Sequence, residues 1–219
     1  MVTLNDVITN KDVRDYIEKA DESLIALGYT EHSFPHVKRV SDTAMYILKT
    51  LGYGERDIEL AGIAGYLHDI GNLVNRIEHA QSGAIMAFKI LSDMGMDAGE
   101  LATVLTAIGN HDEGTAVAVN HVAAALILGD KTDVRFTRVR NADMIHFDIH
   151  DRVNYAVRKS DVTINDDKTK ITLDLTIDTE ICAVMDYFEI FIDRMVLCRN
   201  AAQKLGLKFT LIANGQRLL

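Results

Sequence analysis

A single proline, Pro35, occurs in a chain of 219 residues, and this scarcity is the feature that most limits the possible folds. Proline and glycine-rich clusters mark turns and linkers, so a chain almost without proline favours long helices. The sequence contains no low-complexity linker and no internal repeat. We therefore expect one mainly helical domain spanning residues 1–219 rather than two domains joined by a linker.

Apolar residues recur at helical spacing along most of the chain. Asn10 is a candidate N-cap of a first helix, which Gly28 closes. Ser33 is a candidate N-cap of a second helix, with Pro35 in its first turn, where a missing N–H costs little. A third helix should run to Asp69 and stop at Gly71. The expected helices span about residues 10–27, 33–51, 55–69, 78–94, 97–110, 117–129 and 179–205.

The periodicity changes after residue 160. The stretch VTINDDKTKITLDLTI alternates apolar and polar residues around a turn at Asn165–Lys168, which predicts a β-hairpin. The later stretch LKFTLI predicts a short final strand. The fold class expected from these patterns is mainly α, with a small C-terminal β-hairpin.

Charge and composition narrow the classes of partner. A formal net charge of −9 argues against binding to polymeric nucleic acid or an anionic membrane, which usually needs a basic face. The most apolar segment, AVAVNHVAAALILGD, falls short of the roughly 20 residues that span a bilayer. The N-terminus lacks the pattern of a signal peptide. Cys182 and Cys198 form no close-spaced metal or redox motif, so we expect a cytoplasmic thiol protein.

Several histidines and aspartates continue apolar helical stripes at or near the expected helix ends. Burying an unpaired aspartate is costly, and a shared cation can satisfy imidazoles and carboxylates together. Their nitrogen and oxygen atoms suit Zn, Mn or Fe without any thiolate. The alternative is that each histidine is a hydrogen-bonded core residue, and spacing alone does not decide between the two. The residues concerned are His36, His79, His111, Asp130 and the adjacent pair His68–Asp69 in GYLHDIGN.

Taken in chain order, these residues resemble the H…HD…D pattern of the HD-domain metal-dependent phosphohydrolase superfamily. His79 in EHAQSGA and His111 in GNHDEG match the two further histidines of its two-metal members. The resemblance covers about residues 30–140 and implies an HD-domain helical bundle, with residues 158–219 as a C-terminal hairpin and helix. It implies that one ion is held by His36, His68, Asp69 and Asp130, and a second by His79 and His111 with Asp69 bridging.

The resemblance also implies a reaction. Two divalent transition-metal ions, foremost Fe or Mn with Zn, Co, Ni or Mg as alternatives, would activate a bridging water for attack on phosphorus. Asp69 and His68 would form the catalytic centre, and the substrate would be a small anionic compound, phosphorylated or a nucleotide. We expect the substrate to be bound by Lys131, Arg135, Asn75 and Arg76. The alternative for the basic stretch GDKTDVRFTRVR is an exposed loop.

Other features leave the function open. Asn72 stands where many HD proteins have the lysine of HDIGK, and the HDxxED and GYP motifs of two related groups are absent. An HD-fold di-iron oxygenase uses the same ligand set, and a non-catalytic metal-binding or sensor module is a third class. The apolar segment ICAVMDYFEIFIDRMVLC fits packing within the chain or against a second copy, as in a homodimer. His146 and His150 have metal-ligand spacing but lie in a polar stretch, so we assign them no metal role.

Overall fold

The computed structural model describes residues 1–140 and 149–219, and within these ranges the protein is mainly helical with a small C-terminal sheet. The expected fold class is therefore confirmed. His146 lies outside the described residues. The helices are α1 Leu4–Thr9, α2 Lys11–Ala26, α3 Phe34–Leu51, α4 Glu55–Leu67, α5 His79–Asp93, α6 Ala98–Gly109, α7 His121–Lys131, α8 Ile149–Ala156 and α9 Val184–Lys204, with short 3-10 turns η1 Ile70–Leu73 and η2 Phe136–Arg138. The strands are β1 Val157–Ile164, β2 Lys170–Ile177, β3 Lys208–Ala213 and β4 Gln216–Arg217.

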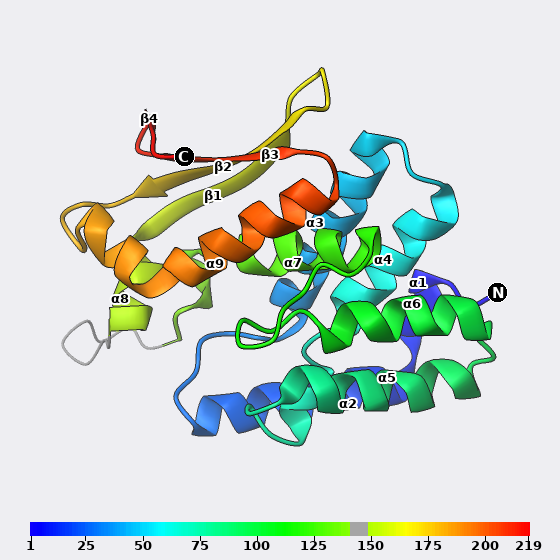
Figure 1. The fold of residues 1–219 in the computed structure, drawn as a ribbon. Helices are drawn as coiled ribbons and strands as arrows, with labels where there is room; N and C mark the ends of the chain where they lie inside the picture. Colours follow the sequence, from blue (N-terminus) through cyan, green and yellow to red (C-terminus); the bar gives the residue numbers. More distant parts are fainter. Residues whose placement is uncertain (141–148) are drawn as a thin grey trace.

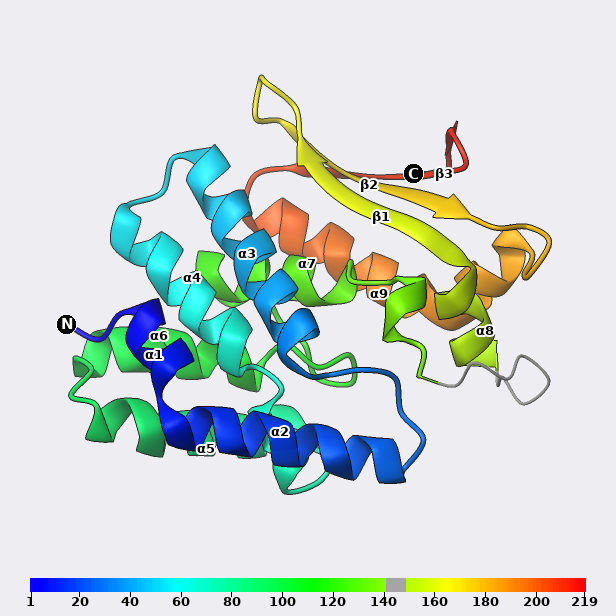
Figure 2. The same cartoon turned by 180° about the vertical axis from the view of Figure 1, so that it is seen from behind.

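The sheet lies along one edge of the molecule, with α9 running beside it (Figure 1). Helices α2 and α5 lie farthest from the sheet, and α9 lies between the sheet and α7, as both views show (Figures 1 and 2). Helix α3 packs against both α4 and α7, while α9 contacts α7 on one side and β3 on the other. Helix α9 thus joins the C-terminal sheet to the helical part of the chain.

The strand order of the sheet is β1-β2-β3-β4. The predicted hairpin is present as the antiparallel pair β1 and β2, with Ser160 opposite Leu175. The predicted final strand, β3, pairs with β2 in parallel, and β4 then pairs with β3 antiparallel. A parallel pair needs a long crossover connection, and α9 supplies it.

Capping side chains explain where some of the helices begin. Asn10 caps α2 as predicted, because its side chain accepts a hydrogen bond from the backbone N–H of Val13 at 3.1 Å. Asn120 caps α7 in the same way, and α7 therefore begins at His121 rather than near residue 117. Ser33 occupies the cap position of α3, but its hydroxyl donates instead to Glu31 at 2.7 Å.

Two further boundaries differ from the sequence expectation, and three short elements were not predicted. Helix α4 ends at Leu67, so the His–Asp pair follows the helix instead of lying on it. Helix α9 begins at Val184 and not at residue 179, because the carbonyl of Asp178 accepts from the N–H of Ile181 and organises a turn there. The short elements α1, α8 and β4 carry too few residues for a clear periodic pattern.

Two glycines bring α3 unusually close to its neighbours. A Cβ added at Gly65 of α4 would lie 2.7 Å from the Cα of Ser41, and one added at Gly129 of α7 would lie 2.8 Å from the carbonyl oxygen of Val40. Larger residues would push these helices apart, so the small side chains allow the N-terminal end of α3 to meet the C-terminal ends of α4 and α7. Among the helices described, none is both long and apolar enough to cross a lipid bilayer.

Candidate metal centre

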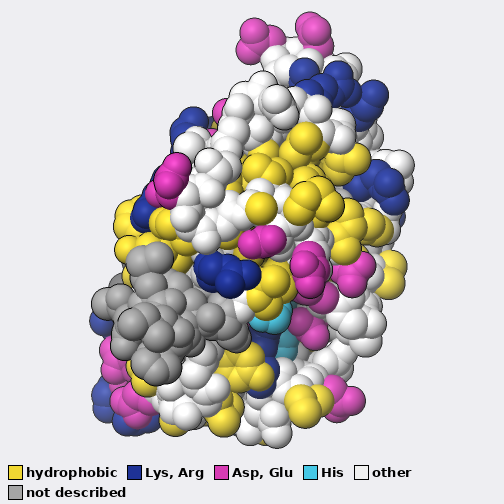
Figure 3. Space-filling model, turned by 90° about the vertical axis from the view of Figure 1, so that its left-hand side faces the viewer, with side chains coloured by type: hydrophobic (Ala, Val, Ile, Leu, Met, Phe, Trp, Pro, Cys, Tyr) yellow, Lys and Arg dark blue, Asp and Glu magenta, His cyan; other side chains and the backbone are white. Residues whose placement is uncertain are grey.

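The six residues of the expected metal set come from separate helix ends and meet in one place. His36 lies in the first turn of α3, His68 and Asp69 follow α4, His79 begins α5, His111 follows α6, and Asp130 lies near the end of α7. Five of them are buried and Asp130 is partly buried. Figure 3 shows histidine side chains at the base of a hollow in one face of the molecule.

Asp69 lies between two groups of imidazoles. Its Oδ2 is 3.5 Å from Nε2 of His36 and 3.3 Å from Nε2 of His68. Its Oδ1 is 3.3 Å from Nε2 of His79 and 3.8 Å from Nε2 of His111. Each carboxylate oxygen therefore faces a different pair of histidines, which is the arrangement needed for a residue that bridges two ions.

Asp130 completes the group around His36. Its Oδ1 lies 3.5 Å from Nε2 of His36 and 3.8 Å from Nε2 of His68. The ligand atoms of these three residues lie within 4.8 Å of one another, as do those of His68, Asp69 and His111. On the other side of Asp69, the Nε2 atoms of His79 and His111 are 3.2 Å apart. The donor atoms are thus close enough to share cations.

The hydrogen bonds behind the imidazoles leave their inner nitrogens available. The Nδ1 atoms of His68, His79 and His111 lie 2.8, 3.0 and 2.6 Å from the backbone carbonyl oxygens of Gly65, Arg76 and Ile108, respectively. A carbonyl only accepts, so each Nδ1 carries the proton and each Nε2 presents a lone pair to the centre.

Three buried polar atoms of the centre support a metal site directly. Nε2 of His36, Nε2 of His68 and Oδ2 of Asp69 have no hydrogen-bond partner among the residues that the structure describes. Leaving such atoms unsatisfied is costly, and a divalent cation would satisfy all three. Imidazole nitrogen and carboxylate oxygen suit the transition metals, so the residues present fit the group that was expected.

His36 is held from behind by a carboxylate that the sequence analysis missed. Its Nδ1 donates to Oδ2 of the fully buried Asp133 at 2.8 Å. Oδ1 of Asp133 accepts from Nε of Arg135 at 2.7 Å and lies 3.1 Å from Nε of Arg39. Arg138 donates to the backbone carbonyl of Asp133 at 2.9 Å. Asp133 thereby fixes both the position and the tautomer of His36.

The pKa values of His36 and His111 are shifted in opposite directions. Burial and the charge of Arg138 lower the pKa of His36, but the three surrounding carboxylates outweigh them and raise it to about 10. Burial lowers the pKa of His111 to about 4, with only partial compensation from Asp69. Burial raises the pKa of Asp69, but contacts with the histidines more than offset this and hold it well below its usual value. Asp69 is therefore ionised and able to bind a cation.

The cavity beside this centre has a volume of about 260 Å³. Of the residues expected to bind substrate, Lys131 and Arg76 line it. Nζ of Lys131 lies 2.7 Å from Oδ2 of Asp130. Arg135 lines a different hollow, because it turns towards Asp133. Asn75 is not among the lining residues, and its side chain instead accepts from the N–H of Ile77 at 2.9 Å.

The cavity also contains residues that the sequence analysis did not assign to it. Arg138 belongs to the basic stretch for which an exposed loop was the alternative, yet it is buried and lines the cavity. Arg194 of α9 lines it too and lies 2.5 Å from Glu113, another lining residue. His150 also lines the cavity. In the sequence, only its metal-ligand spacing from His146 had drawn attention to it. Arg194 comes from outside the segment that carries the motif, so no local pattern pointed to it.

The local structure corrects one part of the sequence argument. The chain leaves the helix at Asp69, with φ −96° and ψ 2°, so Asp69 does not lie on α4 beside the residues before it. Gly71 does not end α4; it lies in η1. A Cβ added at Gly71 would lie 2.0 Å from the carbonyl oxygen of His79 and 2.4 Å from the backbone nitrogen of Gly83. Glycine is required there because α5, which carries His79, packs directly on η1.

Comparisons with known proteins found a domain family and similar chains. The family model described as HD domain matches residues 34–189. The uncharacterized protein MJ1020 of Methanocaldococcus jannaschii is 27% identical over 187 residues, which cover 75% of this chain and 72% of that protein. A crystal structure of a predicted HD superfamily hydrolase from an uncultured Thermotogales bacterium is 27% identical, covers 56% of this chain and 68% of that one, and superposes with a TM-score of 0.44.

Proposed function

The chain belongs to the HD domain family, and we propose that it is a metal-dependent phosphohydrolase acting on a small phosphorylated compound or a nucleotide. The observation that carries this proposal is the position of Asp69, whose two oxygens each face a separate pair of buried imidazoles. A structural role for the cluster would not require buried nitrogen and oxygen atoms to be left unsatisfied.

The proposed ligand groups follow from the distances. His36, His68, Asp130 and Oδ2 of Asp69 would hold one ion, while His79, His111 and Oδ1 of Asp69 would hold the second. Divalent ions bound there would lower the pKa of a coordinated water to near neutrality and would offset the negative charge of a phosphate group. We propose Fe or Mn as the bound metals, with Zn, Co, Ni or Mg as alternatives.

The cations around the cavity support an anionic substrate despite the acidic chain. Lys131, Arg76, Arg138 and Arg194 all line it. Arg138 is held rigidly, because its Nε and Nη1 donate to the backbone carbonyls of Glu31 and Asp133, each at 2.9 Å. A guanidinium has five N–H donors, so Arg138 retains donors for a phosphate oxygen. These residues would bind and orient the phosphate beside Asp69 and exclude bulk water.

The experiment is a panel of phosphomonoesters, phosphodiesters and nucleotides assayed with Mn²⁺, Fe²⁺, Co²⁺ or Mg²⁺. Asp69→Asn keeps the size of the side chain but removes the charge that faces all four imidazoles. It should lower phosphate release by at least roughly 1,000-fold, as expected when charge stabilisation by the metals is lost. Asp93→Asn is the matched control, because Asp93 is exposed and pairs only with Lys89 on the surface of α5 among the described residues.

Two results would contradict the proposal. One is full activity of the Asp69→Asn protein, which would place the chemistry elsewhere. The other is an absence of phosphate release with every metal, combined with substrate-dependent O₂ uptake by the iron-loaded protein. That result would favour the di-iron oxygenase, which uses the same kinds of ligand. Failure of the purified protein to bind any transition metal would favour a non-catalytic module.

A further inference from the structure

A second hollow, of about 550 Å³, lies between α3 and β1 on the other side of Asp133 from His36. Its lining includes Lys38, Arg39, Thr43, Tyr46, Arg135 and Thr163, and it shares no lining residue with the cavity beside the metal centre. We propose that this groove is a second ligand site, which binds a nucleoside phosphate with its phosphates on Arg39, Arg135 and Lys38 and its ring against Tyr46. The proposal does not depend on the proposed reaction.

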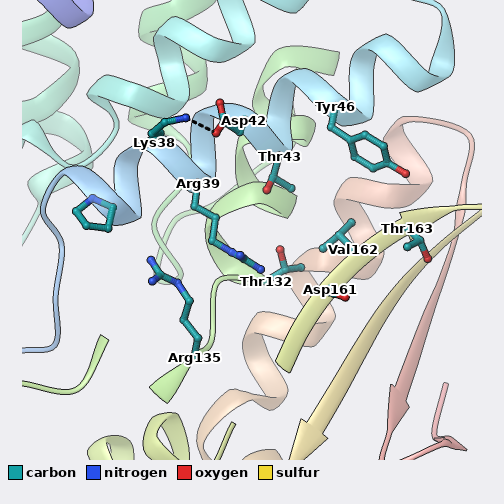
Figure 4. Close-up of a pocket in the computed structure, with 11 residues that line it drawn as sticks. Lys38, Arg39, Asp42, Thr43, Tyr46, Thr132, Arg135, Asp161, Val162 and Thr163 are labelled. Atoms are coloured by element: carbon teal, nitrogen blue, oxygen red, sulfur yellow. Dashed lines mark hydrogen bonds and ion pairs between the residues drawn. The ribbon is translucent and has the colours of Figure 1, made fainter. Parts of the chain in front are cut away.

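The arginines at the basic end of the groove are held in fixed positions by other residues. Figure 4 shows the guanidinium groups of Arg39 and Arg135 together at one end. Buried Asp133 holds both from behind, at 3.1 Å from Nε of Arg39 and 2.7 Å from Nε of Arg135. Arg39 also donates to the backbone carbonyl of Ser160 on β1. Side chains fixed in this way lose little rotamer freedom when a phosphate binds.

The carboxylates near this end leave donors of the two arginines unused. Asp133 is shared by Arg39, Arg135 and, at 4.0 Å, Arg138, and Glu31 is 3.7 Å from Nη2 of Arg135. The two acidic residues that line the groove, Asp42 and Asp161, pair with Lys38 and Lys159. Each guanidinium has five N–H donors, more than Asp133 takes from it, so a phosphate would bind to the remaining donors.

Lys38 adds a third cation to the lining of the groove. Its partner, Asp42, is on the same helix at 2.8 Å, and both side chains are largely exposed. Exposed pairs of this kind contribute little to stability. Lys38 can therefore turn from Asp42 to a phosphate at small cost.

The other end of the groove offers an aromatic side chain on which a nucleotide base would stack. Tyr46 is 39% exposed, and its hydroxyl accepts from the backbone N–H of Ile164 at 3.3 Å, which ties the ring to β1. Val162 lines the groove between the two ends, and Tyr46 and Thr163 lie at the end away from the guanidinium groups (Figure 4). Aromatic side chains stack on bases without sequence preference. The volume is within the range of small-molecule sites, and a phosphate end opposite a ring end matches the layout of a nucleotide.

The test measures binding of ADP to the metal-free protein by calorimetry in EDTA, so that no hydrolysis intervenes. Thr43→Glu places a negative charge in the groove without touching the network around Asp133. Thr103→Glu makes the same change on α6, and Arg76→Gln removes a cation from the metal-centre cavity. We expect ADP to bind the wild type in a one-to-one complex, Thr43→Glu to weaken binding at least tenfold, and the other two variants to bind as the wild type does.

Two outcomes would overturn the proposal. The first is no detectable binding of ADP by the wild-type protein. The second is binding that Arg76→Gln weakens and Thr43→Glu leaves unchanged, because ADP would then lie in the metal-centre cavity. Circular-dichroism melting of each variant establishes that it is folded, and Arg39→Gln gives an independent loss of a phosphate contact. The first outcome leaves the proposed hydrolysis at the metal centre untouched, and the second would place ADP in the cavity that is proposed to bind the substrate.

Discussion

Replacing Asp133 with asparagine should weaken metal binding although residue 133 touches no metal in the proposed arrangement. The carboxylate uses both oxygens as acceptors: Oδ1 for the Nε–H groups of Arg39 and Arg135, and Oδ2 for Nδ1 of His36 at 2.8 Å and, more weakly, for Nη2 of Arg135 at 3.2 Å. Asparagine has one acceptor oxygen and one donor NH₂ group. The two guanidinium groups cannot accept, so they keep the oxygen, and the NH₂ group then faces His36.

The NH₂ group would force the wrong tautomer on His36. Nδ1 would have to accept a hydrogen bond, which moves the imidazole proton to Nε2, the atom that lies 3.5 Å from carboxylate oxygens of both Asp69 and Asp130. Loss of a carboxylate behind a ligating histidine typically costs 10–100-fold in metal affinity. We therefore expect Asp133→Asn to lose about 1.4–2.8 kcal/mol of binding free energy for the ion near His36.

The affinity is measured by competition with a chelator of known strength, using Mn²⁺ and Co²⁺. Asp161→Asn is the control, because Asp161 is half exposed and pairs with Lys159 on the surface. Thermal melting of the metal-free proteins separates loss of affinity from loss of fold. An affinity within twofold of the wild type, in a folded Asp133→Asn protein, would refute the role assigned to Asp133.

Two substitutions and one titration test separate parts of the structure. A methyl group on Gly71 would lie 2.0 Å from the carbonyl oxygen of His79, so Gly71→Ala should lower the free energy of unfolding by roughly 1–3 kcal/mol. Gly114→Ala is the control, because Gly114 has open space around it; equal melting temperatures of the two variants would contradict the close packing of α5 on Gly71. The pKa of metal-free His36 is raised to about 10, so His36 is protonated at pH 8 and metal binding there should release about one proton. Calorimetry in buffers of different ionisation enthalpy measures the protons released, and a release of zero would refute this prediction. Nη1 of Arg76 lies 3.2 Å from Nε2 of His79, where its charge repels a cation, so Arg76→Gln should tighten binding of the second ion by roughly tenfold, about 1.4 kcal/mol. A two-site metal titration measures this affinity, and weaker binding by the variant would contradict the prediction.

The longer helices could be predicted because their signals are local, and the six residues of the candidate centre could be predicted from their helix positions together with the order of the motif. Asn10 precedes an amphipathic run, and its cap follows from side-chain chemistry alone. His111 and Asp130 each continue an apolar stripe, which places them at buried helix ends. The motif order then supplied the grouping around Asp69, which spacing alone had left open.

The surroundings of the centre could not be predicted because they depend on contacts between distant segments. Arg138 lies in a basic stretch that looks exposed, but its guanidinium donates to the carbonyl of Glu31, which is 107 positions earlier in the chain. Asp133 looked like part of the same polar loop until His36 was found 2.8 Å away. The alternation of residues 162–177 predicted the hairpin, but it contained no information on the parallel pairing with β3.

The most direct test of the account is anomalous diffraction from crystals of the protein loaded with Mn²⁺. The account predicts two peaks on opposite sides of the carboxylate of Asp69, one beside His36, His68 and Asp130, and the other beside His79 and His111. Peaks elsewhere, or no peak within coordination distance of Asp69, would contradict the central claim that this carboxylate binds two cations.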